Sequence, residues 1–325
     1  MKVLVTGSEG FVGKELVKSL LQSGIEVVGI DRVENTSAIW EHHTLDLTEP
    51  LELEINEYDI VVHCAAAKGD WGISNEEFHN DNIAATQNLI DHLKVCSITR
   101  IIHFSTVSIY SRNVTTGDED TLIEPESIYG QTKLDSELLI REFAIDRKIP
   151  TVILRPSVIY GRNNYANMYN LTKQLARSLP IQINPEGIIK SHVSVLNVVD
   201  VVMKFSDLNR QVDDVEIYNL TESPYLDLSE IIGIICTELA VKPPKINIPH
   251  WAASFIFSTL ELVARLIRKD LGFTKERLLK YSNSTHYTSE KLWGKIGRQK
   301  FKTEDQLRDM VKWFKQKNND TISIE

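Results

Sequence analysis

Tyr129 and Lys133 are the two residues whose types and spacing most directly suggest chemistry. They are four residues apart in a segment with helical periodicity, so their side chains share one helix face. A phenol is a weak base at neutral pH, but an ammonium held beside it favours the phenolate. Such a pair can move a proton on the oxygen of an alcohol while a hydride moves on its carbon. A surface tyrosine beside a solvated lysine is the alternative that spacing alone leaves open.

Two hydroxyl side chains, Ser105 and Thr106, directly follow the apolar run 101–104. Such runs predict buried strands, and open α/β sheets place their sites at the carboxyl ends of strands. A hydroxyl there can donate a hydrogen bond to the reacting oxygen and stabilise charge on it. Either residue could therefore support the chemistry of the Tyr129–Lys133 pair.

A glycine cluster follows the first apolar run of the chain, with Gly7, Gly10 and Gly13 three residues apart. The segment after it has helical periodicity, so the glycines occupy a strand–turn–helix junction. Gly7 suits a tight turn, Gly10 allows close approach of a pyrophosphate, and Gly13 allows the helix to pack on the strand. The helix N-terminus offers N–H groups to phosphates. The arrangement predicts a dinucleotide site.

Acidic residues at the ends of the next strands indicate which dinucleotide is bound. Asp31 ends the second apolar run, where a carboxylate can accept hydrogen bonds from the ribose diol of NAD and repel the 2′-phosphate of NADP. Arg32 follows it and could instead bind that phosphate, so NADP stays open. Asp46 follows a third short strand and could accept from the adenine amino group or cap its own loop.

The elements around these residues alternate between strand and helix. Short β-branched runs predict strands at 3–5, 27–30, 60–63, 101–104 and 152–154, and helical periodicity predicts helices over 11–21, 82–93 and 129–144. This alternation predicts an α/β protein with a Rossmann-type, doubly wound parallel sheet covered on both faces.

The second half is less regular. Residues 193–199 and 216–220 read as strands or strand–helix junctions, and helices dominate from 228–239 onward. We expect an NAD-binding domain at 1–165, rejoined by 191–222, and a smaller, mostly helical substrate lobe at 166–190 and 223–325. Within that lobe, Trp251–Ile267 reads as an amphipathic helix that packs on the body, with a membrane surface as the alternative.

Composition excludes several classes of protein. The chain has 325 residues, 42% hydrophobic, with a net charge of −9, which argues against nucleic-acid binding. Cys64, Cys96 and Cys236 are widely spaced and form no CxxC pair, so we expect no disulfide scaffold or zinc site and a reducing, cytoplasmic location. The histidines show no HxxxH or HExxH spacing, so no metal is expected. No apolar stretch reaches the length of a membrane span.

Five motifs in sequence order resemble those of the extended short-chain dehydrogenase/reductases of the NAD-dependent epimerase/dehydratase group. They are Thr6–Gly13 (TGSEGFVG), Asp46-Leu47, Val62–Ala66 (VHCAA), Asn82–Leu89 and Leu154–Gly161 (LRPSVIYG). Several are weak singly, but together they are specific. Features of the 3β-hydroxysteroid dehydrogenase-like members are also present, because 192–201 is similar to their VxNVVDA element.

The resemblance implies a role for each matched residue. Tyr129 is implied as the acid/base, Lys133 as its partner and Thr106 as the catalytic hydroxyl. The chain departs from the family pattern at Ala85 and Ser111, where glycines are usual. The cofactor NAD, with NADP as the alternative, is implied to contact Gly7, Glu9, Gly10, Phe11, Val12, Gly13, Asp31, Arg32, Asp46, Leu47, Cys64, Ala65, Ala66, Asn82, Ser105, Tyr129, Lys133, Pro156 and Ser157.

The substrate is less well defined by the sequence. Positions after predicted strands suggest a small-molecule site that includes Lys68, Trp71, Ser108, Arg162 and Asn197. The preferred interpretation is interconversion of a secondary hydroxyl and a ketone on a nucleoside-diphosphate sugar. A sterol-like or β-hydroxy acid dehydrogenase and a non-catalytic dinucleotide sensor are the alternatives. The resemblance also implies a homodimer formed by the helices containing 82–93 and 129–144.

Overall fold

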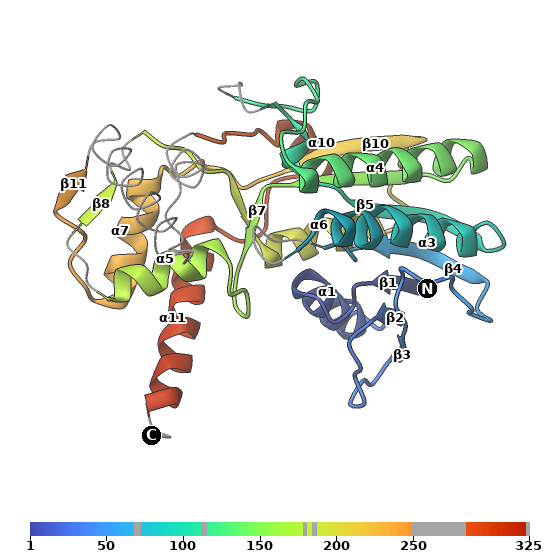
Figure 1. Cartoon of the computed structure of the whole chain (residues 1–325), viewed down its shortest axis with the longest axis horizontal. Helices are drawn as coiled ribbons and strands as arrows, with labels where there is room; N and C mark the ends of the chain where they lie inside the picture. The colour runs from blue at the N-terminus through green and yellow to red at the C-terminus, as the bar shows by residue number, and fades with distance from the viewer. Residues whose placement is uncertain (68–72, 112–115, 178–180, 184–186, 249–283, 323–325) are drawn as a thin grey trace. The chain divides into compact units, whose positions relative to one another are not determined.

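The computed structural model describes residues 1–67, 73–111, 116–177, 181–183, 187–248 and 284–322 (Figure 1). Contacts between residues divide the chain into two compact units. Unit 1 contains Met1–Ile159, His192–Glu222 and Tyr287–Lys300, and unit 2 contains Tyr160–Ser191, Ser223–His286 and Phe301–Glu325. The chain therefore leaves unit 1 and returns to it twice.

Unit 1 is built on a seven-stranded sheet with the order β10-β6-β5-β4-β1-β2-β3 (Figure 1). Every pairing in it is parallel. The strands are β1 (Lys2–Thr6), β2 (Glu26–Asp31), β3 (Glu41–Thr44), β4 (Glu57–His63), β5 (Ser97–Phe104), β6 (Thr151–Pro156) and β10 (Val215–Leu220). The Rossmann-type fold expected from the sequence is confirmed.

Both faces of the sheet are buried, which explains its nearly continuous apolar strands. Side chains alternate along β1, so Val3 and Val5 enter one core cluster while Leu4 enters the other. The first cluster contains residues of α1 (Phe11–Gln22), α6 (Val195–Ser206) and α10 (Glu290–Ile296). The second contains residues of α3 (Ala85–Leu93) and α4 (Ile128–Arg147).

The helix before α3 is irregular. The sequence predicts one helix over 82–93, but the structure has α2 (Asn75–His79), a π-helical turn η1 (Asn80–Ala84) and then α3. The hydroxyl of Thr86 donates to the Asn82 carbonyl. Single π-helical turns of this kind often occur at functional sites, and Asn82 is one of the implied cofactor residues.

Shorter elements complete unit 1. They are η2 (Val107–Ile109), β7 (Val158–Tyr160) and β9 (His192–Ser194). The sequence places all of 223–325 in the substrate lobe, whereas Tyr287–Lys300 belongs to unit 1. The reason is that Leu292 and Ile296 of α10 complete one core cluster of the sheet. Helical periodicity predicts that such a helix forms but does not identify the core it joins.

Unit 2 is mostly helical. Its helices α5 (Asn167–Ala176), α7 (Leu228–Leu239) and α11 (Thr303–Ile322) pack around a separate apolar core. A capping box between Asp227 and Glu230 starts α7, and β8 (Ile181–Ile183) pairs with β11 (Ile246–Ile248). The predicted helix Trp251–Ile267 lies outside the described residues. Within the described ranges, no helix is long and apolar enough to cross a membrane.

Candidate active site

The glycine turn after β1 needs glycine at two positions for different reasons. Gly7 has φ +71°, and a Cβ there would lie 2.8 Å from the backbone nitrogen of Ala65. A Cβ on Gly13 would overlap the carbonyl oxygen of Gly7 and lie 2.9 Å from Cα of Ser8. Gly10 is the N-cap of α1 and supplies no capping side chain, and the first turn of α1 has no acidic residue. The turn and helix start thus form a cradle suited to phosphates.

The carboxylate of Asp31 holds the end of β2 against this turn. Its two oxygens accept from the backbone N–H groups of Glu9 at 2.9 Å and Val33 at 3.0 Å. The Arg32 guanidinium pairs with Asp81 at 2.7 Å, and that hydrogen bond raises the pKa of Arg32. Because Arg32 is already bound to a carboxylate, the geometry favours a ribose diol over a 2′-phosphate at this position.

Asp31 gives a test of cofactor choice. We expect the protein to bind NAD more tightly than NADP, and Asp31→Ala to weaken NAD binding by about 10- to 100-fold, the value of a hydrogen bond to a charged group. Isothermal titration with both dinucleotides measures this. Asp59→Ala, on β4 of the same sheet, is the control. Equal loss of affinity in both variants would contradict the assignment of Asp31.

The catalytic candidates and the cradle lie at one edge of the sheet. Thr6 at the end of β1 is in register with His63 of β4, which pairs with His103 of β5, which pairs with Ile153 of β6. The segments that follow these strands carry Gly7, Cys64–Ala66, Ser105–Thr106 and Ser157, and Pro156 ends β6. Since all strands are parallel, these segments emerge at the same carboxyl edge, where ligands bind in open α/β sheets.

Asn82 links the segment after β4 to the helix of Tyr129 and Lys133. It is 1% exposed, its side-chain oxygen accepts from the Ala67 backbone at 2.8 Å, and its amide donates to the Thr132 hydroxyl at 3.0 Å. The Thr132 hydroxyl in turn donates to the carbonyl of Tyr129 at 3.2 Å. Asn82 therefore fixes the first turn of α4 relative to the sheet edge.

Lys133 is 3% exposed. Burial lowers its pKa to about 8, and Cys64 and Glu137 act in the opposite direction. Lys133 is therefore not the solvated lysine that was the alternative, and burial of its ammonium makes it a candidate functional residue. Tyr129 is one turn earlier on α4, and its ring lies 6.1 Å from that of Phe78.

Buried hydroxyl groups follow the ends of β1 and β5. Thr106 is 5% exposed, and its side chain accepts from the backbone of Ser108 at 3.1 Å. The buried hydroxyls of Ser105 and Ser8 have no hydrogen-bond partner among the described residues. Buried polar groups are normally paired. The Ser8 hydroxyl faces Gly29 of β2, so the feature of this edge that fits a bound dinucleotide is the glycine cradle.

The other implied cofactor residues take ordinary positions. One oxygen of Asp46 accepts from the backbone and hydroxyl of Thr48, both at 2.9 Å, which is the loop-capping arrangement. Ser157 binds the carbonyl of Leu220 through its backbone N–H at 3.0 Å and its hydroxyl at 3.3 Å. Burial raises the pKa of Cys64 to about 12, so this thiol is no nucleophile at neutral pH.

The expected substrate residues are dispersed. Ser108 is exposed after β5, while Asn197 is 1% exposed and donates to Glu222 at 2.5 Å. Arg162 pairs with Asp309 of α11 within unit 2. Lys68 and Trp71 lie outside the described residues.

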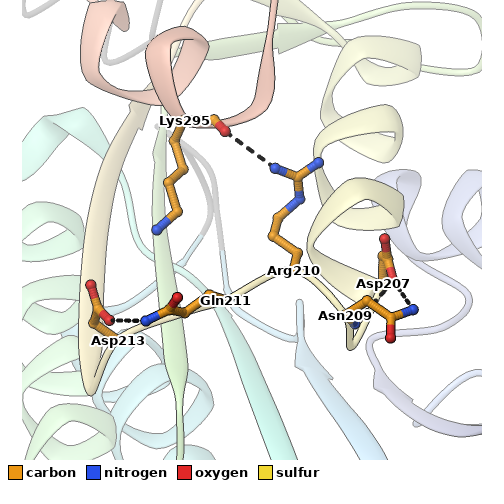
Figure 2. A pocket seen from close by; sticks show the side chains of 6 residues that line it. All are labelled: Asp207, Asn209, Arg210, Gln211, Asp213 and Lys295. Atoms are coloured by element: carbon orange, nitrogen blue, oxygen red, sulfur yellow. Dashed lines mark hydrogen bonds between the residues drawn. The ribbon is translucent and has the colours of Figure 1, made fainter.

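A surface depression of unit 1 lies away from the cofactor edge. Figure 2 shows its lining, which includes Arg210 donating to the Lys295 carbonyl and Gln211 donating to Asp213. Asp213 precedes β10, so the depression borders the amino end of that strand. Ligands of this fold bind at the carboxyl ends, and we therefore place the active site elsewhere.

A buried polar chain behind the active site was not found from the sequence. His63 hydrogen bonds to Thr6 at 2.7 Å and to Thr86 at 3.0 Å, and Thr86 also bonds to Ser136 at 2.8 Å. Burial lowers the pKa of His63 to about 3, and Lys133 acts in the same direction. The VHCAA motif was matched only for its backbone, and the two partners of His63 come from β1 and α3, which lie elsewhere in the sequence.

This histidine predicts acid lability. Its folded pKa of about 3 lies below the ordinary 6.5, so the unfolded chain takes up a proton first as pH falls. The free energy of unfolding should therefore decrease by several kcal/mol between pH 6.5 and 3. Urea titrations at several pH values should show a shallower decrease for His63→Asn than for wild type. The exposed His79→Asn should keep the wild-type slope, and identical slopes in all three proteins would contradict the prediction.

Comparisons with known proteins agree with this geometry. The profile of the NAD dependent epimerase/dehydratase family matches residues 3–220. The chain therefore belongs to this family, and it is an NAD-dependent enzyme of the extended short-chain dehydrogenase/reductase type.

Relatives are similar over most of their length. N-acetyl-alpha-D-glucosaminyl-diphospho-ditrans,octacis-undecaprenol 4-epimerase of Escherichia coli O157:H7 is 24% identical, over 89% of this chain and 88% of that protein. UDP-glucose 4-epimerase of Vibrio cholerae is 26% identical, over 85% and 89%. The crystal structure of UDP-glucuronic acid 4-epimerase from Bacillus cereus with NAD has the same fold, with a TM-score of 0.75, 22% identity and coverage of 97% and 99%.

Proposed function

We propose that the protein is a 4-epimerase of a diphosphate-linked sugar, with a nucleoside diphosphate as the favoured carrier. The observation that carries the proposal is that Lys133 is buried on the same helix face as Tyr129, at the sheet edge that holds the glycine cradle. The relatives named above support the substrate class, because each is named for the 4-epimerisation of a sugar carried on a diphosphate.

In this mechanism the chain's residues handle protons and orientation. NAD held at the glycine cradle would supply the hydride chemistry, because its nicotinamide can take a hydride from the sugar carbon and give it back to the other face of the ketone. Tyr129 removes the hydroxyl proton as the hydride leaves and gives it back on return. Lys133 favours the phenolate form of Tyr129. Thr106 donates to the reacting oxygen, and the proton and hydride are both restored at the end of the cycle.

The test is product analysis. UDP-glucose, UDP-N-acetylglucosamine and UDP-glucuronic acid are each incubated with the protein, and the C4 epimer is followed by proton NMR. We expect one of them to reach an equilibrium mixture without net formation of reduced nicotinamide. If the protein turned over only undecaprenyl-diphosphate-linked N-acetylglucosamine, supplied in detergent, the sugar carrier would be a lipid diphosphate instead of a nucleoside diphosphate. The name of the Escherichia coli relative is the reason to test this substrate. Steady accumulation of reduced cofactor would indicate a net dehydrogenase and contradict the epimerase.

We also propose a homodimer formed through α3 and α4, which contact one another in unit 1. Leu138 and Ile145 on α4 are 48% and 56% exposed, and Val95 after α3 is 76% exposed. Leu138 and Ile145 are seven residues apart and therefore share one exposed face of α4, and exposed apolar patches can mark an interface.

Light scattering should give the mass of a dimer at micromolar concentration. Leu138→Glu combined with Ile145→Glu should give the monomer, because charges would be buried without partners. Ile39→Glu is the control, since Ile39 is 85% exposed between β2 and β3. A wild-type monomer, or a dimer that survives the double substitution, would exclude this interface.

A further inference from the structure

A buried ion pair lies one helical turn beyond Lys133. Glu137 and Arg155 are 0% and 1% exposed, and they form two hydrogen bonds, Nε to Oε2 at 3.1 Å and Nη2 to Oε1 at 2.6 Å. Glu137 follows Tyr129 and Lys133 at four-residue steps, so all three share one face of α4. Arg155 comes from β6, directly before the implied cofactor residue Pro156.

The pair also holds the segment that carries Thr106. The remaining Arg155 nitrogen, Nη1, donates to the Tyr110 hydroxyl at 2.7 Å, and its guanidinium lies 5.1 Å from the centre of the Tyr110 ring. The Tyr110 hydroxyl then donates to the Asn219 side chain of β10 at 2.8 Å. One guanidinium thus joins α4, β6, β10 and the turn after β5.

The surroundings of Lys133 show why this arrangement matters. Titratable groups that act on its ammonium include His63 of β4, Cys64 after β4, His103 of β5 and Glu137 of α4. Tyr129 lies one turn earlier on α4, and the Arg155 cation is bound to Glu137. Burial drives the two histidines toward the neutral form, and it raises the pKa of the thiol. Glu137 is the carboxylate of this group. Both of its oxygens accept from the Arg155 guanidinium, which is a charge-assisted, two-pronged pair.

We propose that Glu137 is a positioning residue of the catalytic centre, whose carboxylate, held by Arg155, keeps the buried ammonium of Lys133 charged. The inference rests on the proposed role of Lys133 beside Tyr129. Replacing a buried ion pair by apolar groups is often neutral or stabilising, so stability alone does not explain why this salt bridge is present. A role in positioning the charge of Lys133 does explain it.

The decisive measurement is the titration of Lys133 itself. The lysine Cε signals of NAD-saturated, ¹³C-lysine-labelled protein are followed by NMR against pH, and the Lys133 signal is assigned by its loss in Lys133→Met. In Glu137→Gln we expect the Lys133 midpoint to fall by about one unit or more, the usual effect of removing an opposite charge at close range. The control is Glu216→Gln, which removes the partner of Lys295 at 2.8 Å in the same unit, and it should leave the midpoint unchanged.

A second variant separates charge from stability. Glu137→Gln alone leaves Arg155 buried and unpaired, so the protein should melt at a lower temperature. Adding Arg155→Met removes that unpaired charge and should restore much of the melting temperature. It should also reverse part of the fall in the Lys133 midpoint, because the guanidinium charge opposes the ammonium. A wild-type midpoint in folded Glu137→Gln would overturn the proposal. Because no substrate is added, failure of the epimerase assay would not affect this result.

Discussion

Replacing Tyr129 with phenylalanine should lower turnover by about 10²- to 10⁴-fold, the usual contribution of a positioned acid/base. The substitution removes one oxygen atom and keeps the ring, which lies 6.1 Å from Phe78. Packing in the first turn of α4 should therefore survive, as should the link through Thr132 and Asn82. Affinity for NAD should change little, because the cradle belongs to the turn after β1. Steady-state turnover of the confirmed sugar and isothermal titration with NAD measure the two effects separately.

The control is Tyr165→Phe, which removes an exposed phenol from unit 2. It should keep wild-type turnover. If Tyr129→Phe matched wild type, the proton would have to move through another group, and Thr106 would be the next to test. If both NAD affinity and turnover collapsed, Tyr129 would be a structural residue and the acid/base assignment would be wrong.

The fold was largely predictable because its signals are local. The run at 3–5 predicts a strand, and β1 covers Lys2–Thr6; helical periodicity at 228–239 predicts a helix, and α7 has those bounds. The strand–helix alternation then leads to a parallel sheet. The structure and the family match confirm this fold class.

Features that depend on distant partners were not predictable. Arg155 was visible only as part of an LRP motif, and its pairing with Glu137 requires β6 and α4 to be adjacent. Arg162 looked suitable for a polar substrate, but its partner Asp309 is 147 positions away in the chain. A charged side chain shows its chemistry in the sequence, whereas its partner is determined by packing.

The candidate active site was only partly predictable from the sequence. The glycines, Asp31, Tyr129 and Lys133 could be proposed from the sequence because spacing and position after strands constrain them directly. The sequence does not reveal that Lys133 is almost completely buried, or that Asn82 connects the sheet edge to its helix. Because Lys133 is buried, its ammonium must be stabilised by the protein instead of by water. The four-residue spacing of Tyr129 and Lys133 is common in sequences and does not by itself show this requirement.

Substitution of Gly13 by alanine should have the second large effect, this time on cofactor binding. The added methyl would overlap the Gly7 carbonyl, a backbone atom that cannot rotate away as a side chain can. Either α1 must move away from the turn or the turn must open, and both displace the N–H groups that would bind the phosphates. We expect NAD affinity to fall by at least about 10²-fold and stability by about 1–3 kcal/mol, as for other overpacked sites.

Gly233→Ala is the matched control for adding a methyl group to a helix. Gly233 lies inside α7 of unit 2, and a Cβ there meets nothing within 4 Å. Because alanine is favoured over glycine in a helix, this variant should gain about 0.5–1 kcal/mol and leave NAD affinity unchanged. Isothermal titration and urea unfolding of both variants provide the comparison. Wild-type NAD affinity in Gly13→Ala would mean that the turn after β1 does not hold the phosphates, and the site would have to be sought away from this cradle.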